Sequence, residues 1–364
     1  MEIFEAARLT VRLGAIASNF RKFQDMSRPA AVSAVVKADA YGLGMTQVAK
    51  HLHGVGADTF FVARLEEGVA LRPVVPDARI FVLDGAPPPA VPALVAYRLI
   101  PVLNSLAEIS AWQNAAKQAR TTLDGAIHFD TGMNRLGLPK TELDVLAAEH
   151  VRRLDGVRVN LWMSHLACGD DPHDAMNGLQ WDRFRAALAM LPAAPASLSS
   201  SAGAMLGVDY AFDMVRPGIG LYGGNPQPGG LNPFSTVAIL VARILQLRRI
   251  DKGESVGYGA TYRASRPATL ATAALGYTDG IMRSLGNRGS GAIGGKRAPV
   301  VGRVSMDLVV LDVTEISGAD VGAEVEFTGD TIRLEEIAAN AGTASYEILT
   351  SLARRVPRHY EAGT

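Results

Sequence analysis

The sequence Val35-Val36-Lys37-Ala38-Asp39-Ala40-Tyr41-Gly42-Leu43-Gly44 places a single lysine between an apolar run and a loop that contains two glycines. The apolar run 31–36 has the length and composition of a buried strand, and a helical pattern follows it over 45–53. In an α/β barrel, active-site residues collect where the strands end, which is where Lys37 lies. This stretch therefore predicts both a fold and the position of a site.

A lysine at the end of a strand often does no more than point into water, and position alone favours that interpretation. The apolar residues before Lys37 argue otherwise, because burial lowers a lysine pKa from its usual value of about 10.4 and favours the nucleophilic amine. The following Tyr41-Gly42-Leu43-Gly44 offers a phenol and a pliable backbone, which suit a phosphate or a ring. Together these features favour a Schiff base between Lys37 and pyridoxal phosphate (PLP).

The quoted stretch also resembles the signature around the PLP-binding lysine of the alanine racemase family. This resemblance implies that Lys37 holds PLP and that Tyr41 contacts the cofactor. It further implies a fold type III PLP enzyme, and it can be followed along the rest of the chain.

Composition limits the class of protein. The chain has 364 residues, of which 48% are hydrophobic, and its 36 basic and 36 acidic residues balance. We therefore expect a large core and no nucleic-acid partner, which would need a basic patch. The single cysteine, Cys168, excludes an internal disulfide and fits a reducing compartment, and its thiol is more simply structural than nucleophilic. Without a signal-peptide pattern or a membrane-spanning apolar run, we predict a cytoplasmic protein that makes no membrane contact and has no metal site.

Short apolar runs alternate with helical patterns over the first 230 residues, which predicts an α/β class protein with an N-terminal (β/α)8 TIM-type barrel. Helical patterns include 11–27, 45–53, 105–119 and 177–191. The eight predicted strands are 31–36, 60–63, 79–83, 100–103, 126–130, 158–165, 196–199 and 215–222.

The pattern changes after the glycine- and proline-rich stretch 223–230, which marks a domain boundary. We assign residues 1–230 to the PLP-binding barrel and residues 231–364 to a mainly β C-terminal domain. Predicted strands of the second domain are 236–245, 268–275, 300–313 and 324–327, with helices at 334–340 and 346–354.

The segment His128-Phe129-Asp130-Thr131-Gly132-Met133-Asn134-Arg135-Leu136-Gly137 follows the fifth predicted strand. Alone, it would be a turn with an exposed arginine. It resembles a racemase segment whose arginine helps to hold the substrate, which implies that role for Arg135. Many family members carry a carbamylated lysine where this chain has His128. No carbamate can form on His128, so we expect His128 itself or an anion to orient Arg135.

Two further segments place polar side chains on barrel strands. A histidine such as His165 at a strand end is often only a satisfied polar residue, but the resemblance implies that it packs beside the cofactor and bonds Arg216. The segment Val215-Arg216-Pro217-Gly218-Ile219 resembles the family segment whose arginine donates to the pyridine nitrogen. Arginine keeps its proton and does not protonate that nitrogen, which favours return of a proton to Cα over transamination.

A third group of residues suits the cofactor phosphate. The run Ser199-Ser200-Ser201 follows the seventh predicted strand, where barrels often bind phosphate, although a plain serine-rich loop is about as good an interpretation on its own. The resemblance adds Ser201, the backbone N–H groups of Gly218 and Ile219, and Tyr346 to the expected phosphate site.

The second domain carries segments that resemble the rest of the family signature. In Gly257-Tyr258-Gly259-Ala260-Thr261-Tyr262 the resemblance makes Tyr258 the second catalytic base, which enters the site from the partner subunit. A tyrosine has a pKa of about 10 and needs help to act near neutral pH, and His165 and Arg216 could supply it. Tyr277 would lie where the substrate enters, and the Met306 backbone would hold the substrate carboxylate. The resemblance thus implies a homodimer with shared active sites.

The resemblance spans residues 35–360 and predicts a two-base alanine racemase, with Lys37 and Tyr258 on opposite faces of Cα, that supplies D-alanine for cell-wall peptidoglycan. One alternative is a racemase of serine or of several amino acids, because pocket volume is not readable from the sequence. A non-catalytic PLP-binding protein would lack the β domain, and a fold type III decarboxylase would need an acidic residue in place of Arg216.

Overall fold

The lysine-bearing stretch lies at the end of a barrel strand. The computed structural model describes residues 5–363. In it, β2 (Ala31–Val32) and β3 (Ala34–Val35) form one extended run directly before Lys37. A seven-stranded parallel sheet runs in the order β3-β4-β5-β6-β7-β8-β9, and β2 pairs with β10 on its other side.

Backbone hydrogen bonds from Asp213 N to Ala196 O (3.0 Å) and from Arg216 N to Ser199 O (2.9 Å) join β10 to β9 and close the circle. The predicted α/β barrel is therefore confirmed. Its remaining strands are β4 (Thr59–Val62), β5 (Arg79–Val82), β6 (Ile100–Leu103), β7 (Leu123–His128), β8 (Val157–Met163), β9 (Ala196–Ser197) and β10 (Met214–Val215).

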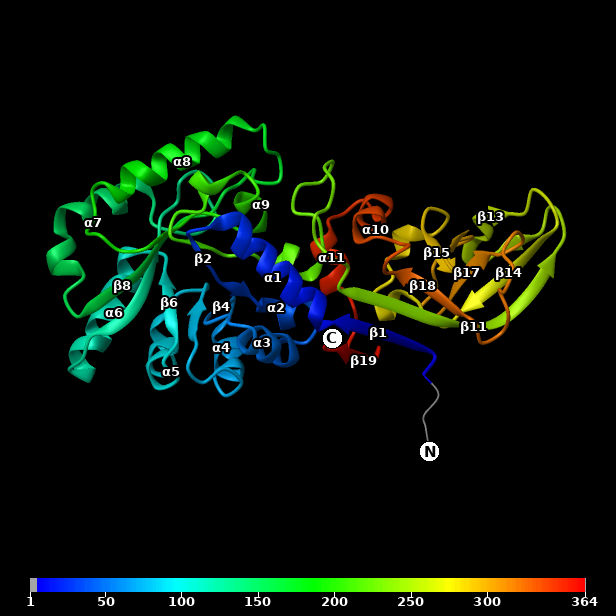
Figure 1. Ribbon diagram of the computed structural model, residues 1–364, viewed down its shortest axis with the longest axis horizontal. Coiled ribbons are helices and arrows are strands. Elements are labelled where there is room, and N and C mark those ends of the chain that lie inside the picture. Colours follow the sequence, from blue (N-terminus) through cyan, green and yellow to red (C-terminus); the bar gives the residue numbers. More distant parts are fainter. Residues whose placement is uncertain (1–4, 364) are drawn as a thin grey trace.

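Helices surround the barrel on the left of Figure 1. Their apolar faces pack on the strands, as α1 shows by burying Ile16, Phe20 and Phe23. The barrel helices are α1 (Leu13–Ser27), α3 (Met45–Gly54), α4 (Leu65–Leu71), α5 (Val91–Ala96), α6 (Leu106–Ala119), α7 (Lys140–Arg153), α8 (Ala175–Leu188) and α9 (Ser201–Ala204).

The second domain extends to the right of Figure 1 and is mainly β, as predicted. Its main sheet runs β16-β15-β18-β11-β1-β19, and β14 and β17 attach through β11. The elements are β11 (Ala238–Ile250), β12 (Ser255–Val256), β13 (Tyr262–Arg263), β14 (Ala268–Ala273), β15 (Ser290–Ile293), β16 (Lys296–Pro299), β17 (Val309–Asp312), β18 (Glu324–Thr328), α10 (Leu334–Ala341), α11 (Ser345–Thr350) and β19 (Arg358–Glu361).

Strand β1 (Ala7–Arg12) was not predicted. It pairs antiparallel with β11 and parallel with β19, so the start of the chain lies in the sheet of the second domain although we assigned it to the first. The change of pattern near residue 230 remains our proposed boundary for the rest of the chain.

Two strand predictions were too long. Of the predicted strand 215–222, only Val215 is in a strand, the two-residue β10, and Ile219–Tyr222 form a 3-10 turn, because Pro217 has no N–H to continue a ladder. The predicted strand 300–313 keeps only Val309–Asp312, since Gly302 turns the chain with a φ of 77° and an exposed loop precedes the strand.

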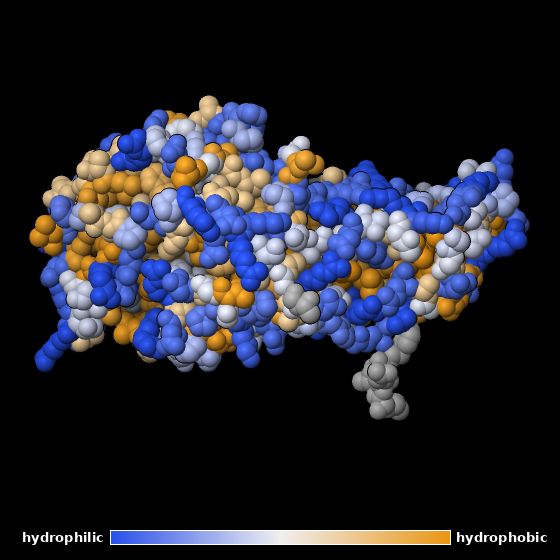
Figure 2. Space-filling model, in the orientation of Figure 1, coloured by the Kyte–Doolittle hydropathy of each residue, from blue (hydrophilic) through white to orange (hydrophobic). Residues whose placement is uncertain are grey.

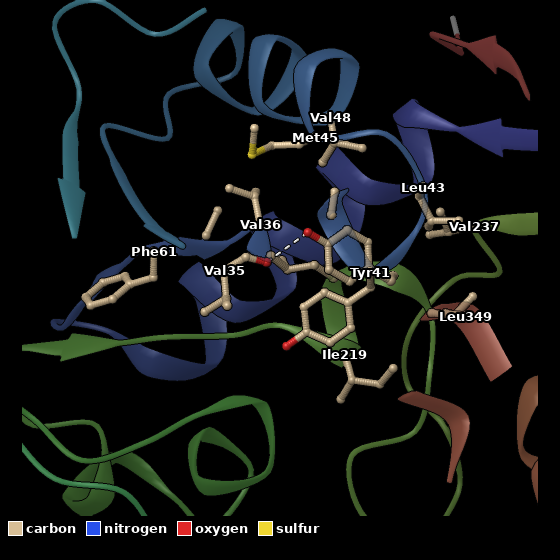
Figure 3. Packing of buried hydrophobic residues seen from close by; sticks show 14 of the residues in the cluster. Val35, Val36, Tyr41, Leu43, Met45, Val48, Phe61, Ile219, Val237 and Leu349 are labelled. Atoms are coloured by element: carbon tan, nitrogen blue, oxygen red, sulfur yellow. Dashed lines mark hydrogen bonds between the residues drawn. The ribbon is translucent and has the colours of Figure 1, made fainter. Parts of the chain in front are cut away.

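The core beneath Lys37 is apolar. Figure 3 shows Val35, Val36, Phe61 and Ile219 packed together, and the hydroxyl of Tyr222 donates to the Val35 carbonyl at 2.8 Å. On the face in Figure 2, hydrophilic residues cover much of both domains, and the larger hydrophobic areas lie over the barrel. Within residues 5–363, no helix combines the length and hydrophobicity needed to cross a bilayer.

Leu9 tests the contribution of β1. Its side chain is fully buried between β11 and β19, so Leu9→Ala should lower the free energy of unfolding by about 2–5 kcal/mol. Urea unfolding at fixed protein concentration measures this change. Thr10→Ala, on the opposite face of β1, is the control and should cost less than about 1 kcal/mol. Equal losses for both variants would show that β1 adds little through its buried face.

Candidate active site

Lys37 begins a short turn with unusual backbone angles. The residues from Ala38 to Tyr41 have φ values between 53° and 56°, which is the left-handed region, before Gly42 continues with a φ of 82°. This conformation costs an L-residue about 1–2 kcal/mol, so the surrounding structure must hold it.

Side chains from separate segments hold this turn. Glu67 accepts a hydrogen bond from the Ala38 N–H at 2.6 Å, and Asp39 accepts one from the Met45 N–H at 2.8 Å. Arg358 donates to the Gly42 carbonyl at 2.8 Å from the far end of the chain. The position of Lys37 is thus fixed by its barrel neighbours and by the C-terminal segment.

The turn borders a cavity of about 610 Å³ at the carboxyl ends of the barrel strands. This volume lies within the usual range for small-molecule sites, about 300–1,000 Å³. Nine predicted site residues line it and are brought together by the fold: Lys37, Tyr41, Arg135, His165, Ser201, Arg216, Gly218, Ile219 and Tyr346.

The lysine is tuned toward its neutral form. Burial lowers the pKa of Lys37, and the positive charge of Arg135 lowers it further. Glu67 and Asp84 act in the opposite direction but do not cancel the effect. A lysine with a lowered pKa is a better nucleophile and base near neutral pH.

Arg216 is a buried cation with neutral partners. Its side chain is 4% exposed and donates to the Ser197 hydroxyl, to the Ser164 carbonyl at 2.6 Å and to the Leu198 carbonyl at 3.3 Å. Burial lowers the pKa of Arg216 to about 9, which still leaves the guanidinium charged at neutral pH. The cavity therefore carries a positive charge that favours an electron-rich or anionic ligand.

The tautomer of His165 follows from its contact with Arg216. The guanidinium of Arg216 has only donors, and its Nη2 lies 3.4 Å from His165 Nδ1, so Nδ1 accepts. Burial, then the charge of Arg216, lowers the pKa of His165 well below its ordinary value. A neutral His165 with an accepting Nδ1 carries its proton on Nε2, where it can donate to a group in the cavity.

One end of the cavity is rich in hydrogen-bond donors. The Ser201 hydroxyl accepts from the backbone N–H groups of Gly218 at 2.8 Å and Gly220 at 3.2 Å. A Cβ added to Gly218 would lie 2.2 Å from the Tyr41 hydroxyl, so only glycine allows this close approach. Burial raises the pKa of both Tyr41 and Tyr346, the latter to about 12, so both phenols keep their protons.

His128 has a partner that the sequence analysis missed. Asn104 donates its amide to the carbonyls of Val102 (2.8 Å) and Leu83 (3.3 Å), which orients its Oδ1 toward His128 Nδ1 at 2.9 Å. Nδ1 must therefore carry the proton, and Nε2 is left as an acceptor. Burial and the charges of Arg216 and Arg135 lower the pKa of His128 to about 4, so the ring is neutral.

Asn104, Asp84 and Glu67 were absent from the predicted site. Asn104 and Asp84 directly follow predicted barrel strands, so the rule that led to Lys37 would have found both. Glu67 forms a capping box at the start of α4, and its role at the Lys37 turn depends on tertiary contact.

Of the four predicted site residues in the second domain, Tyr346 lines this cavity, whereas Tyr258, Tyr277 and Met306 do not line it within the described structure. Tyr258 is 71% exposed, Met306 is 53% exposed and Tyr277 is 42% exposed. All three lie in the domain that extends away from the barrel in Figure 1.

The fold and the site define a class of protein: a parallel barrel with a strand-end lysine facing a buried arginine, joined to a β domain. Family models match both parts, with the alanine racemase N-terminal domain over residues 11–226 and its C-terminal domain over residues 237–360. The chain belongs to the alanine racemase family.

Known alanine racemases match this chain over nearly its whole length. An alanine racemase of Methylobacterium nodulans is 46% identical over 98% of this chain and 97% of its own. A catabolic alanine racemase of Agrobacterium fabrum is 43% identical over 98% of this chain and 92% of its own. The alanine racemase structure of Bartonella henselae, with covalently bound pyridoxal phosphate, has a TM-score of 0.94 and 38% identity, covering 98% of this chain and all (100%) of that one.

The neutral state of His128 predicts a pH effect on stability. Between its ordinary pKa of 6.5 and its folded pKa of about 4, the unfolded chain binds a proton at His128 that the folded chain does not. Stability should therefore fall as the pH drops through this window, by roughly 3 kcal/mol from this residue. His128→Gln should flatten the dependence of the unfolding free energy on pH, measured in urea between pH 4.5 and 6.5.

His173→Gln is the matched control, because His173 is exposed on the barrel surface. It should leave the slope unchanged. A His128→Gln variant with the parent slope would mean that His128 is protonated equally in the folded and unfolded chain.

Proposed function

We propose that this chain is a PLP-dependent alanine racemase that interconverts L-alanine and D-alanine as a homodimer with shared active sites. The observation that carries the proposal is a single cavity that joins Lys37, with its lowered pKa, to the buried cation Arg216. Family membership over both domains and the alanine-specific names of the relatives support the same substrate. Nothing in those names favours serine, and the matched C-terminal domain argues against a non-catalytic cofactor carrier.

The residues present fit PLP. Lys37 is the amine that would hold its aldehyde carbon, and Arg216 would donate to its ring nitrogen. The Ser201 hydroxyl, the Ile219 N–H and the phenols of Tyr41 and Tyr346 form a set of neutral donors suited to a phosphate. The Gly218 N–H, which donates to Ser201 Oγ at 2.8 Å, would share its hydrogen bond with that phosphate. When bound to an amino acid, this cofactor withdraws electrons from Cα and makes the Cα proton easier to remove.

The protein must then remove a proton from one face of Cα and return one to the other. Lys37, with its lowered pKa, suits proton transfer at Cα, and the family resemblance assigns it the D-isomer. Tyr258 of the partner subunit would serve the L-isomer. His165, which carries its proton on Nε2, can donate to that phenolate and so help Tyr258 act near neutral pH.

Other side chains orient the substrate. Arg135 lies at the mouth of the same cavity and offers a fork of donors for the substrate carboxylate. The Nε2 atom of His128 carries no proton, so it can accept a hydrogen bond from that guanidinium and orient it. His128 stands at the position where the resembled family segment often carries a carbamylated lysine. The backbone of the partner's Met306 would complete the carboxylate site, and the partner's Tyr277 would lie where the substrate enters.

The incomplete site of a single subunit supports the proposed dimer. A subunit supplies Lys37 and the cofactor-binding residues, whereas its own Tyr258, Tyr277 and Met306 are exposed away from its cavity. A second copy of the chain offers the same three residues in return. In a symmetric dimer, each subunit could place these three residues in the cavity of the other.

We propose that the product D-alanine supplies cell-wall peptidoglycan synthesis. Because some relatives are named catabolic alanine racemases, a role in alanine breakdown is the second possibility. Growth of a strain that lacks the gene distinguishes the two roles. A requirement for added D-alanine supports the role in peptidoglycan synthesis. Loss of growth on alanine as the sole carbon source supports the role in alanine breakdown.

Replacing the two bases tests the mechanism. Lys37→Ala should lose the cofactor absorbance band together with activity, and Tyr258→Phe should keep the band but lose about 10²–10⁴-fold in rate, as expected for a lost general base. Chiral chromatography of the alanine product and visible absorbance are the measurements. An active, coloured Lys37→Ala protein would remove Lys37 from its role.

Mixing the two inactive variants tests the shared site. A mixed dimer contains one site with Lys37 from one subunit and Tyr258 from the other, so subunit exchange should restore activity. If a purified mixed dimer is as inactive as its parents, each subunit must use its own Tyr258, and the shared site is wrong.

A further inference from the structure

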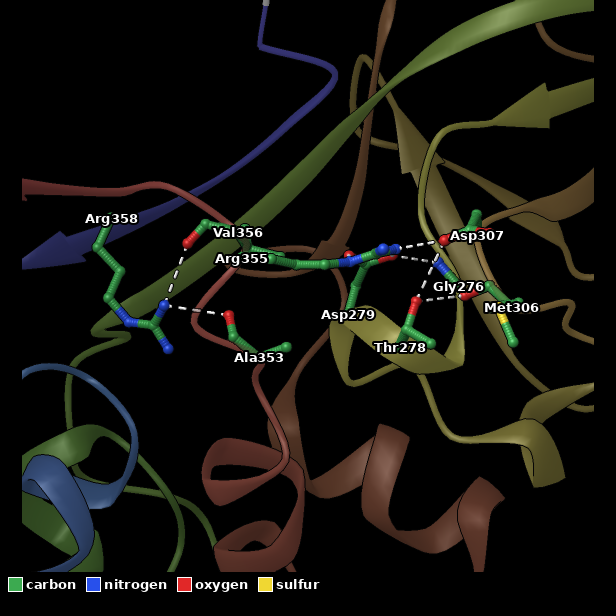
Figure 4. A network of polar contacts seen from close by, with 9 residues as sticks. All are labelled: Gly276, Thr278, Asp279, Met306, Asp307, Ala353, Arg355, Val356 and Arg358. Carbon is green, nitrogen blue, oxygen red and sulfur yellow. Dashed lines mark hydrogen bonds and ion pairs between the residues drawn. The ribbon is translucent and has the colours of Figure 1, made fainter.

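The segment from Ala353 to Arg358 connects α11 to β19. Two of its three arginines, Arg355 and Arg358, point in opposite directions (Figure 4). Arg355 extends toward the loops of the β domain. Arg358 turns back toward its own chain segment and the barrel. Each arginine ends on a group next to residues of the proposed active site.

Arg355 holds two carboxylates. Its Nε and Nη2 donate to the two oxygens of Asp279 at 2.5 and 3.0 Å, and Nη2 also donates to Asp307 at 2.6 Å. The side chain of Asp279 is only 8% exposed and accepts a third hydrogen bond from the Gly276 N–H at 2.8 Å. A bidentate contact of this kind fixes orientation as well as distance.

These carboxylates belong to the loops that carry Tyr277 and Met306. Asp279 ends the turn Tyr277–Asp279, and Asp307 directly follows Met306. The loops also bond each other, from Tyr277 N to Ser305 O at 3.0 Å and from the Thr278 hydroxyl to Met306 O at 2.8 Å. Arg355 therefore fixes the relative position of two exposed residues that the proposed function assigns to the partner's site.

Arg358 contacts the turn that carries Lys37 in its own subunit. Its Nε and Nη2 donate to the Gly42 carbonyl at 3.0 and 2.8 Å, at the end of the left-handed turn that begins with Lys37. It also donates to the carbonyls of Ala353 and Val356, both at 3.1 Å, which fixes the segment itself. The Ala353 N–H in turn donates to the Asp279 carbonyl at 3.1 Å, so the two ends are joined by backbone contact.

We propose that this segment serves both active sites of the dimer: Arg358 positions the Lys37 turn of its own subunit, and Arg355 positions Tyr277 and Met306 for the site of the partner. The inference rests on the shared-site dimer of the proposed function. It makes Arg355 a positioning residue that acts across the interface, through loops it contacts directly. Substrate binding should depend on it more than cofactor binding does.

Mixed dimers with one competent site distinguish the role of Arg355 from that of Arg358. In a dimer of a Lys37→Ala subunit and a Tyr258→Phe subunit, the competent site takes Tyr258, Tyr277 and Met306 from the first subunit and Lys37 from the second. Arg355→Gln in the first subunit should raise the KM for alanine about tenfold, with a smaller change in kcat and an unchanged cofactor band. The same substitution in the second subunit should change kcat/KM by less than about twofold.

Arg358→Gln should give the reverse dependence, with an effect only in the subunit that supplies Lys37. Arg266→Gln, which removes an exposed ion pair with Glu315 in the same domain, is the control and should have no effect in either subunit. Asp307→Asn provides a second test if Arg355→Gln does not fold, because Asp307 is 56% exposed. Asp307 accepts one of the three hydrogen bonds that Arg355 donates to the two carboxylates. Arg355→Lys, which keeps the charge but not the fork, should recover part of the loss.

A parent mixed dimer without activity would overturn the shared site, and this proposal with it. An active parent in which Arg355→Gln acts equally in both subunits, or in neither, would overturn the proposal alone. A thermal unfolding temperature measured for each dimer identifies a loss of activity that comes from unfolding.

Discussion

The left-handed turn after Lys37 is the constraint on which the rest of the site depends. Its residues take a conformation that L-amino acids avoid, so it persists only because other side chains hold it. Glu67 binds one end from the barrel, and Arg358 binds the other from the C-terminal segment. Lys37 is therefore positioned by contacts from both domains of the subunit. We expect that a barrel alone would carry the lysine without this geometry.

The same cavity keeps its potential bases neutral. Burial lowers the pKa of both His165 and His128, and the charge of Arg216, which is buried among neutral partners, lowers both further. Arg135 lowers the pKa of Lys37 and of both histidines in the same way. Hydrogen bonds then select the tautomers, since Arg216 donates to His165 and Asn104 accepts from His128. The cavity therefore has a positive field that favours an anionic ligand. The groups that line it can each accept or donate one proton.

Much of this arrangement could be predicted from the sequence, because it follows from where the strands end. Lys37 and His165 stand at the ends of predicted barrel strands, and the fold brings them into one cavity with Arg216. Arg216 was expected there from the family resemblance, since the predicted strand 215–222 begins just before it. Long-range pairing could not be predicted: β1 finds its partners in β11 and β19, far along the chain, and local periodicity gives no sign of this. The hairpin β15–β16 was also missed, although Gly294-Gly295 marked its turn. The partners that tune the site, such as Asn104, depend on contacts that no local pattern encodes.

The most direct measurement is isotope exchange at Cα. The purified protein, supplied with PLP, would be incubated with L-alanine in D2O, followed by NMR and by chiral chromatography. The two-base account predicts deuterium at Cα and a mixture that approaches equal amounts of the two enantiomers, because they have the same free energy. Alanine that keeps its Cα proton and remains entirely L, with the cofactor bound, would contradict the assignment of this cavity to alanine racemisation.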